Sequence, residues 1–350
     1  MATFKIENVR IAGISACVPE KKLENKDSLL FESEEEKLRY IETVGVDTRH
    51  VTDENTCSSD LCYAAAERLL NDLGWNKEEI DCLVFVTQTP DYKYPASACI
   101  LQARLSLPMS CLTFDVSMSC PGWIYGLSVV SSLLSAGKLR KALLLTGETV
   151  TKLRSPYDKV NLITGDAGTA TAMEYCEGAK EICFDLNTKG DDYKAVWIRD
   201  GGYRNPFNEH SLDYEVYEDG VTRNGVQTYM DGASIFGFAI KRAPESIRRL
   251  MESFAIEDGQ VDYYLLHQAN KMINDKIIKK LKFDPEKFPS NIREYGNTSS
   301  TAIPLMMVCQ LRKELGGKQS LACGFGGGLA YASTCFTTDE QFVCSELVII

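Results

Sequence analysis

Short apolar runs of strand length alternate with amphipathic stretches along most of the chain. Uninterrupted apolar strands are typical of sheets that helices cover on both faces, most often parallel sheets. The helical stretches have apolar positions three and four residues apart. The runs lie at residues 80–85, 142–145, 261–266 and 321–323, and the helical stretches at 64–73, 127–134, 246–254 and 305–315. This pattern predicts an α/β protein with mostly parallel sheets.

The same pattern returns about 180 residues further along the chain. In each half a helical stretch leads through an acidic loop to an apolar strand that begins beside an aspartate, Asp81 in the first half and Asp262 in the second. This echo predicts two related halves, residues 1–178 and 179–350, stacked as layers. Residues from about 185 to 228 are polar and aromatic, and we expect them to form an inserted loop region at the start of the second half.

The composition narrows the class of protein. The 350 residues are 44% hydrophobic, which is enough to bury large cores. A net charge of -11 and a pI near 5.0 argue against a nucleic-acid partner, because such a partner needs an overall basic face. The thirteen cysteines lack the two-residue spacing of zinc and redox sites, and neither a leader peptide nor a membrane-length apolar run is present. We therefore expect a reduced, soluble, cytoplasmic protein with no membrane partner.

Cys120 is the first candidate for chemistry. It follows the strand-like run 114–116 and precedes a helical pattern of small and apolar residues. A helix start presents unpaired N–H groups and a partial positive charge, and both favour thiolate over thiol. Pro121 fits the first helical position, where a missing N–H costs nothing. We therefore expect Cys120 to be a nucleophile with a lowered pKa, whereas most of the other cysteines are expected to be small buried hydrophobic residues.

Two further polar residues occupy places where α/β proteins put working side chains. His267 ends the apolar strand 261–266, and strand ends of this kind face a crevice. Asn297 lies in the polar cluster 295–300, which opens the next helix. The two other histidines, His50 and His210, lie in polar surroundings and are expected to be solvated surface residues.

These clusters and their neighbours resemble the β-ketoacyl-acyl-carrier-protein synthase III family of the thiolase superfamily. The resemblance runs from about residue 4 to residue 338, and its motifs are specific when taken together. They are residues 45–50, 95–99, 114–120, 165–168, 267–270, 296–299 and 324–328. The resemblance implies a duplicated thiolase-like fold with five layers, α-β-α-β-α, which agrees with the echo at 180 residues.

The resemblance also implies a site and gives each member a role. These members are Cys120, His267 and Asn297 as the catalytic set, the backbone N–H groups of Cys120 and Gly327 as the oxyanion hole, Met230, Gly232, Phe236, Ala269 and Asn270 along the pantetheine tunnel, and Tyr94, which would enter the acyl pocket of the partner subunit in a homodimer.

The implied reaction loads an acyl group on Cys120 and condenses it with the carbanion that malonyl-carrier protein forms as it loses CO2, without a cofactor or a metal. Related hydroxymethylglutaryl-CoA synthases instead use a Glu base, and Gln88 stands at the matching position here. An amide cannot take a proton at neutral pH. The resemblance therefore favours decarboxylation, in fatty-acid or related secondary-metabolite synthesis.

The sequence departs from the family at several positions. Arg39 and Thr43 stand where a Trp and an Arg usually hold the CoA nucleotide, so the acyl donor is open between acyl-CoA and an acyl-carrier protein. Tyr94 replaces the usual Phe, and Pro121 and Trp123 replace the usual residues after the nucleophile. These changes suggest an unusual or polar acyl group.

Other functions remain to be weighed. The nearest alternative is a thiolase-superfamily acyltransferase that passes the acyl group from Cys120 to an oxygen or nitrogen nucleophile. A papain-like hydrolase also has Cys, His and Asn in this order, but it leaves the duplication unexplained. A non-catalytic binding subunit would be expected to lack the nucleophile. Basic residues in 241–249 and 271–282 are either solvated helix faces or a docking site for an acidic carrier protein.

Overall fold

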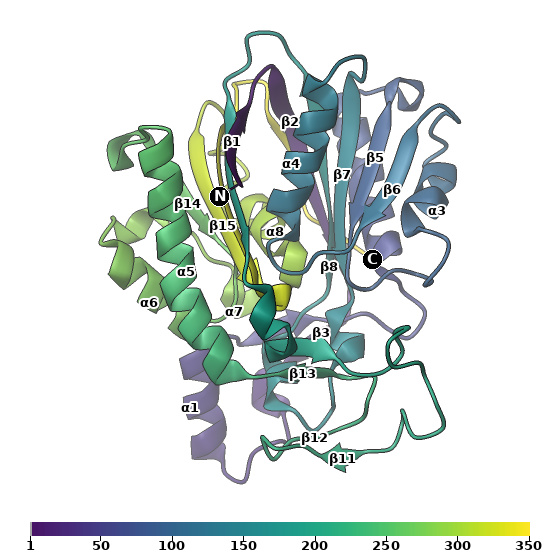
Figure 1. The fold of residues 1–350 in the computed structure, drawn as a ribbon, viewed down its shortest axis with the longest axis vertical. Helices are drawn as coiled ribbons and strands as arrows, with labels where there is room; N and C mark the ends of the chain where they lie inside the picture. Colours follow the sequence, from purple (N-terminus) through teal and green to yellow (C-terminus); the bar gives the residue numbers. More distant parts are fainter. Residues whose placement is uncertain (1) are drawn as a thin grey trace.

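Two sheets form the centre of the computed structural model, which describes residues 2–350 (Figure 1). The larger sheet has seven strands. Six of them lie in the order β17 (Val343–Cys344), β2 (Val9–Val18), β8 (Ala167–Tyr175), β7 (Lys141–Glu148), β5 (Cys82–Val86) and β6 (Leu112–Val116), and the seventh, β18 (Val348–Ile349), also pairs with β2. The smaller sheet has five strands in the order β1 (Ala2–Ile6), β9 (Ile182–Thr188), β16 (Ala330–Thr337), β15 (Gln319–Gly326) and β14 (Tyr263–Leu266).

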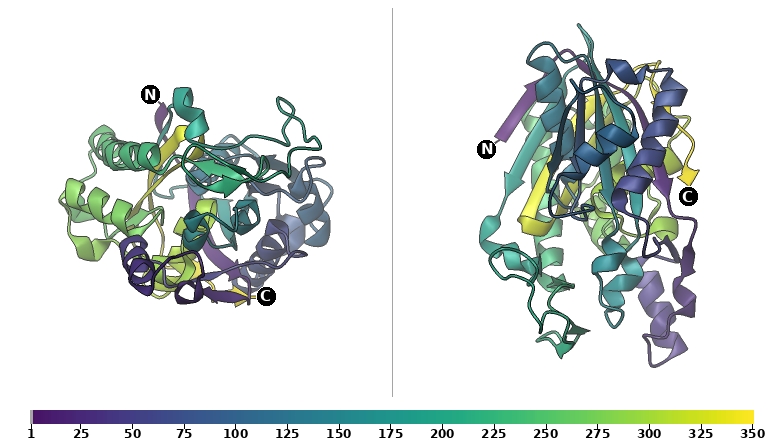
Figure 2. Two further views of the ribbon diagram at one scale, coloured as in Figure 1. Left: turned by 90° about the horizontal axis from the view of Figure 1, so that it is seen from below. Right: turned by 90° about the vertical axis from the view of Figure 1, so that its right-hand side faces the viewer.

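Helices fill the space between the sheets and cover both outer faces (Figures 1 and 2). Helices α4 (Gly122–Ser135) and α8 (Ala302–Gln310) lie between the sheets. The outer face of the larger sheet is covered by α2 (Ser58–Leu73) and α3 (Ser97–Arg104), and that of the smaller sheet by α5 (Gly232–Ser253) and α6 (Lys271–Leu281). The five layers of the expected thiolase-like fold are confirmed.

The duplication is visible in the order and pairing of the elements. The series α2, β5, α4, β7 and β8 in the first half corresponds to α5, β14, α8, β15 and β16 in the second. Strand β5 pairs in parallel with β7, and β14 pairs in parallel with β15. Strands β8 and β16 then return antiparallel to β7 and β15. The prediction of mostly parallel sheets was therefore wrong, because each half closes with a returning strand that makes its sheet mixed.

The two halves exchange their terminal strands. The boundary expected at residues 178 and 179 falls between β8 and β9, which belong to different sheets. However, β1 at the start of the chain pairs with β9 of the smaller sheet, and β17 and β18 at its end pair with β2 of the larger one.

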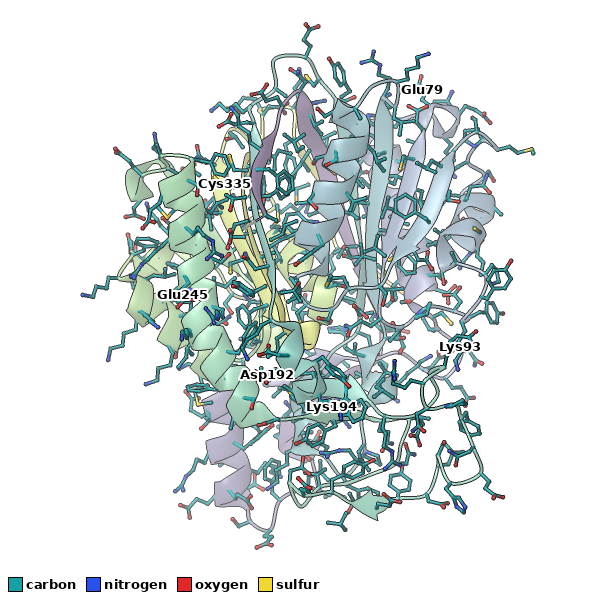
Figure 3. The ribbon with its side chains drawn as sticks, in the orientation of Figure 1. Glu79, Lys93, Asp192, Lys194, Glu245 and Cys335 are labelled. Atoms are coloured by element: carbon teal, nitrogen blue, oxygen red, sulfur yellow. The ribbon has the colours of Figure 1, made fainter. Side chains whose placement is uncertain are left out.

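The insert is shorter and more ordered than expected. Residues 185–188 belong to β9, because Leu186 lies opposite both Ala2 and Ala332 in the smaller sheet. The rest of the insert carries two small two-stranded sheets, β10 (Val196–Ile198) with β13 (Thr228–Met230) and β11 (Glu215–Val216) with β12 (Thr222–Arg223). Figure 3 shows Lys93 close to the insert, and its ammonium group donates a hydrogen bond to the carbonyl of Gly201.

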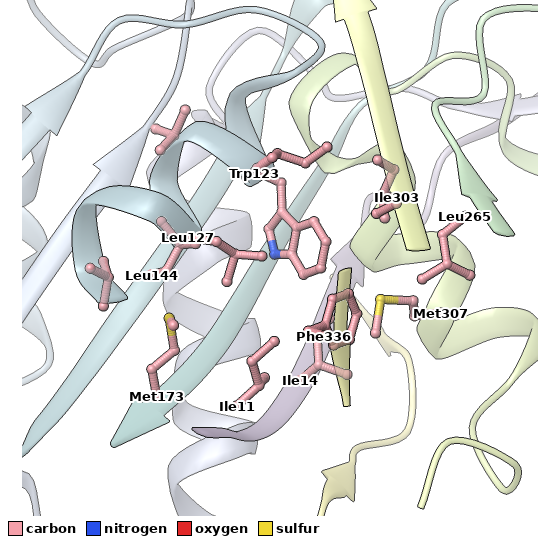
Figure 4. Close-up of a cluster of buried hydrophobic side chains, with 14 of the residues drawn as sticks. Ile11, Ile14, Trp123, Leu127, Leu144, Met173, Leu265, Ile303, Met307 and Phe336 are labelled. Atoms are coloured by element: carbon pink, nitrogen blue, oxygen red, sulfur yellow. The ribbon is translucent and has the colours of Figure 1, made fainter. Parts of the chain in front are cut away.

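Trp123 belongs to the core between the two sheets (Figure 4). Its ring is fully buried, packs edge-on against Phe336 with ring centroids 5.8 Å apart, and donates from Nε1 to Thr171 Oγ1 at 3.0 Å. Trp123 in place of the usual residue therefore affects core packing, and Trp123 does not line the cavity around Cys120.

The remaining elements gather at one end of the molecule, the lower end in Figure 1. They are β3 (Lys22–Glu24), α1 (Glu34–Val44), β4 (Thr48–His50), the insert and α7 (Ile292–Tyr295). Strands β5, β6 and β7 run parallel, so their carboxyl ends share one edge of the sheet. Gln88 and Cys120 come after β5 and β6 at this edge, and Glu148 is the last residue of β7. No helix within residues 2–350 is long and apolar enough to cross a membrane.

Candidate active site

One cavity of about 510 Å³ brings the three predicted catalytic residues together. Cys120 reaches it from the first half of the chain, and His267 and Asn297 reach it from the second. Four other predicted site residues also line it, namely Gly327, Met230, Ala269 and Asn270. Two predicted tunnel residues, Gly232 and Phe236, are not in its lining, where their helix contributes Ile235 instead. Tyr94 lies outside this cavity and is 89% exposed in the single chain.

Cys120 sits at the start of α4, the helix between the sheets. The helix begins at Gly122, one residue later than expected, so Pro121 is its N-cap and not its first helical residue. The backbone at Gly326 passes directly over the thiol, since a Cβ at this position would lie 2.8 Å from Cys120 Sγ. Gly327 lies against Ser119, whose Oγ donates to the Gly327 carbonyl at 3.2 Å. The oxyanion role of Gly327 remains a prediction.

The Cys120 thiol is not acidified in the way the sequence suggested. Burial raises its pKa to about 11, which outweighs the opposing effects of a contact with Ser299 Oγ at 3.8 Å and of the positive charge on Arg154. Desolvation disfavours the thiolate, and the nearby Glu148 adds to that effect. With this pKa the group is a thiol at neutral pH, and it needs an acceptor for its proton.

His267 is held neutral and fixed in place. Burial lowers its pKa to about 3, and its side chain packs edge-on against Phe325. The backbone N–H of His267 donates to the Cys323 carbonyl at 2.8 Å, and its backbone carbonyl accepts from Asn274 Nδ2 at 3.1 Å. Nδ1 is buried without a hydrogen-bond partner among the described residues. A proton on Nε2 avoids a buried, unpaired N–H at Nδ1 and leaves Nε2 as the donor.

Asn297 is anchored by its backbone and oriented by its side-chain oxygen. Its N–H donates to the Ile163 carbonyl at 2.7 Å, and its carbonyl accepts from Gly165 N at 3.1 Å. Oδ1 accepts from Ser299 N at 2.9 Å, which leaves Nδ2 free to donate into the cavity. The approach of the two loops requires glycine at position 165, because a Cβ there would lie 2.2 Å from the Tyr295 carbonyl oxygen.

A buried carboxylate lies behind the thiol. Glu148 is fully buried at the end of β7 and accepts from Ser300 Oγ at 2.8 Å and from Ser299 Oγ at 3.4 Å. Gln88 Nε2 donates to Ser299 Oγ at 2.8 Å and to Glu148 Oε1 at 3.2 Å. A chain of contacts therefore runs from Cys120 Sγ through Ser299 Oγ to the carboxylate.

Comparison with known proteins shows the family to which the chain belongs. The family profile described as 3-Oxoacyl-[acyl-carrier-protein (ACP)] synthase III matches residues 114–190. A second profile, described as the C terminal of the same synthase III, matches residues 251–338. A putative 3-oxoacyl-[acyl-carrier-protein] synthase 3 of Campylobacter jejuni is 33% identical over 98% of both chains. The chain belongs to the synthase III family. The similarity extends to a β-ketoacyl-[acyl-carrier-protein] synthase III of Enterococcus faecalis, 33% identical over 94% of this chain and 98% of the relative.

Solved structures of synthase III relatives show the same fold. The crystal structure of a 3-oxoacyl-(acyl-carrier protein) synthase from Burkholderia xenovorans superposes with a TM-score of 0.93, at 32% identity over 99% of each chain. The priming β-ketosynthase of the R1128 polyketide pathway shares the fold at 23% identity, with a TM-score of 0.82 over 96% of this chain and 98% of its own.

Two residues near the nucleophile of this synthase III family member were not found from sequence: Glu148, which lies behind the thiol, and Arg154, which lines the cavity. Glu148 carried one usable signal, since a charged residue ends an otherwise apolar parallel strand. Arg154 carried none, because it lies in a loop six residues further on and only the tertiary fold brings it to the cavity. His50 was also misjudged. It is half-buried against Tyr295, and its Nδ1 lies 2.6 Å from the Pro19 carbonyl, whereas His210 is exposed as expected.

The buried carboxyl should make stability depend on pH. Burial raises the pKa of Glu148 from its usual 4.5 to about 7, so the folded protein binds this proton more tightly than the unfolded chain does. Folding stability from this group is therefore complete below pH 4.5 and is lost as the pH rises through 7. We expect wild type to lose about 3 kcal/mol more than Glu148→Gln between pH 4.5 and 8, measured by urea unfolding. Parallel pH profiles of the two proteins would contradict this assignment.

Proposed function

We propose that this chain is a β-ketoacyl-[acyl-carrier-protein] synthase III-like condensing enzyme. It loads an acyl group from a thioester onto Cys120 and joins that group to malonyl-carrier protein with loss of CO2. The observation that carries the proposal is the lining of a single cavity by one thiol, one neutral imidazole and one oriented carboxamide.

In the loading step, Cys120 Sγ attacks the thioester carbonyl and its proton passes to Ser299 Oγ, whose own proton passes to Glu148. A carboxyl pKa of about 7 suits Glu148 to accept this proton near neutral pH. The tetrahedral oxyanion is stabilised by the backbone N–H groups of Cys120 and of Gly327, the residue after Gly326, whose backbone lies against the thiol. Collapse of that intermediate breaks the bond to the donor sulfur, which takes up the proton from Glu148 through Ser299 and leaves as a thiol, while the acyl group stays on Cys120.

In the condensation step, the malonyl thioester oxygen accepts hydrogen bonds from His267 Nε2 and Asn297 Nδ2. The bond to the malonyl carboxylate breaks, CO2 leaves, and the electron pair forms an enolate that these two donors stabilise. The enolate carbon attacks the acyl carbon, and the carbon–sulfur bond to Cys120 breaks. A neutral imidazole supports this role, because it supplies a hydrogen bond without taking up a proton.

Gln88 argues against a route through proton abstraction. Its amide donates to both Ser299 and Glu148, which ties it into the hydrogen-bond network behind the thiol. An amide has no basic group at neutral pH, so the carbanion is more readily formed by loss of CO2.

We further propose a carrier-protein partner, a homodimeric assembly and a cytoplasmic location. Exposed lysines on α6, whose first turn borders the cavity at Asn270 and Ile273, suit an acidic carrier protein. Arg39, at one position of the usual CoA clamp, is exposed and pairs with Glu35. All thirteen cysteines are free, which suits a reducing compartment.

The test is stepwise acylation followed by intact-mass analysis. The protein is incubated with a panel of acyl-CoA and acyl-carrier thioesters, and an adduct is sought on Cys120. Malonyl-carrier protein is then added and CO2 is measured. The proposal predicts CO2 release that depends on prior acylation. If the acyl group instead leaves for an oxygen or nitrogen acceptor without CO2, the acyltransferase alternative is correct.

A further inference from the structure

Arg154 places an unpaired positive charge in the wall of the cavity that holds Cys120. It lies in the loop between two short 3-10 helices, Val150–Leu153 and Lys159–Ile163, and its cavity neighbours include the apolar Val150, Leu153 and Ile163. Its Nε and Nη1 atoms are buried and have no hydrogen-bond partner in the described part of the chain.

The acid that would be expected to neutralise Arg154 is engaged elsewhere. Asp158 lies near enough to act on the Arg154 charge, but its Oδ2 accepts from Arg223 Nη2 at 3.2 Å and its Oδ1 from Val160 N at 2.9 Å. Arg223 is itself buried and takes Asp219 as a second partner at 2.9 Å. Two buried guanidinium nitrogens without a partner are costly, so their presence in the cavity of the nucleophile points to a ligand of opposite charge.

The loop that carries Arg154 is fixed on both sides. Before it, Thr151 donates from N and Oγ1 to the buried Asp166, at 3.0 and 2.5 Å. After it, Ser155 Oγ donates to the Thr222 carbonyl at 2.6 Å. The backbone that carries Arg154 is therefore held in position, which lowers the entropic cost of binding.

The cavity lining is mostly apolar but includes threonine hydroxyl groups as well as Arg154. Thr164, Thr188 and Thr228 line the cavity together with the guanidinium group. The charge on Arg154 also reaches Cys120, where it opposes the effect of burial on the thiol pKa. An anion that meets Arg154 must therefore belong to a group lying close to the sulfur. The phosphate of a pantetheine arm lies at the opposite end of the arm from the thioester, so it is too far from the sulfur to be this anion.

We propose that Arg154 binds a carboxylate at the far end of the acyl chain, so that the enzyme selects thioesters of carboxyl-bearing acyl groups. This inference rests on the proposed acylation of Cys120. The malonyl carboxylate is the other nearby anion, but it must leave as neutral CO2. A buried guanidinium that paired with it would stabilise the ground state and oppose decarboxylation. An arginine is suited to a carboxylate because its planar fork matches the two oxygens.

The experiment compares acylation rates by intact mass, without malonyl substrate, for pantetheine thioesters that end in a carboxylate and for their neutral monoamide isosteres, at several chain lengths. We expect wild type to load at least one carboxylate-ended chain about tenfold to a hundredfold faster than its amide, the range typical of a hydrogen bond to a charged group. Arg154→Gln should lose that preference, so that its ratio of carboxylate to amide loading rates falls to about one.

A matched control removes a charge from the same segment outside the cavity. Lys152 is exposed and does not line the cavity, so Lys152→Gln should keep the carboxylate preference. Arg154→Met should fold and be at least as stable as wild type, because it removes an unpaired buried charge. A lower melting temperature for Arg154→Met would contradict the absence of a protein partner for Arg154.

Three other outcomes overturn the inference. If wild type is acylated equally fast by the carboxylate-ended thioesters and by their amides, the enzyme does not select for a carboxylate. A defect of Arg154→Gln confined to CO2 release from malonyl-carrier protein assigns Arg154 to the malonyl group. If sedimentation shows that wild type is a dimer and that Arg154→Gln is a monomer, Arg154 belongs to the subunit interface. Failure of every thioester, charged or neutral, to acylate Cys120 instead rejects the proposed function itself.

Discussion

Cys120→Ala is expected to lose the acyl adduct completely and, with it, all condensation. The acyl group needs a covalent carrier while the second substrate arrives, and a methyl side chain cannot form a thioester. The side chain lies in a tight site between Ser299 and the backbone of Gly326, so its replacement by a smaller one should leave the fold intact. Intact-mass analysis after incubation with an acyl thioester measures the adduct directly.

The control for this variant is Cys99→Ala. Cys99 is an exposed free thiol, and its removal should leave the adduct at the wild-type level. An adduct that persists on Cys120→Ala and disappears from Cys99→Ala would show that surface thiol chemistry, rather than catalysis, explains the modification.

His267→Ala and Asn297→Ala are expected to separate the two half-reactions. Each should leave acyl loading on Cys120 largely intact and slow CO2 release by about 10²–10³-fold, roughly 3–4 kcal/mol, which is the effect of one donor to a developing oxyanion. The reason is that both side chains are proposed to donate to the thioester oxygen of the malonyl group, where negative charge appears only as CO2 leaves. The measurement is CO2 release from malonyl-carrier protein by the pre-acylated variants.

His210→Ala serves as the matched change at an exposed histidine outside the cavity, and it should affect neither step. Full malonyl turnover by either His267→Ala or Asn297→Ala would remove that residue from the enolate site. A loss of loading equal to the loss of CO2 release would instead make it part of the acylation machinery.

The sequence located the three catalytic candidates because each lies at a position marked by local pattern. Cys120 and His267 follow strands, and Asn297 precedes a helical segment, which marked them as candidates, and the family resemblance gave them their shared catalytic role. The halves were also predictable, since the helix and strand pattern repeats at nearly constant spacing.

Features that depend on tertiary contacts could not be predicted in this way. The thiol pKa rises because the folded core desolvates Cys120, and this effect exceeds the local influence of the helix start. The exchange of β1 and β17 between the sheets is set by long-range pairing, and Trp123 faces the core through packing between layers. Arg154 reaches the cavity only because Asp166 and Thr222 fix the loop on either side of it.

The central claim is that a carbon nucleophile collects the acyl group from Cys120. It is tested most directly by a single turnover of isolated acyl-enzyme with malonyl-carrier protein labelled with ¹³C at the central malonyl carbon. The account predicts that the acyl mass leaves Cys120 at the rate at which CO2 appears, and that the labelled carbon becomes bonded to the former acyl carbonyl in a β-ketoacyl thioester. Loss of the acyl group with the malonyl carboxylate still intact would contradict it.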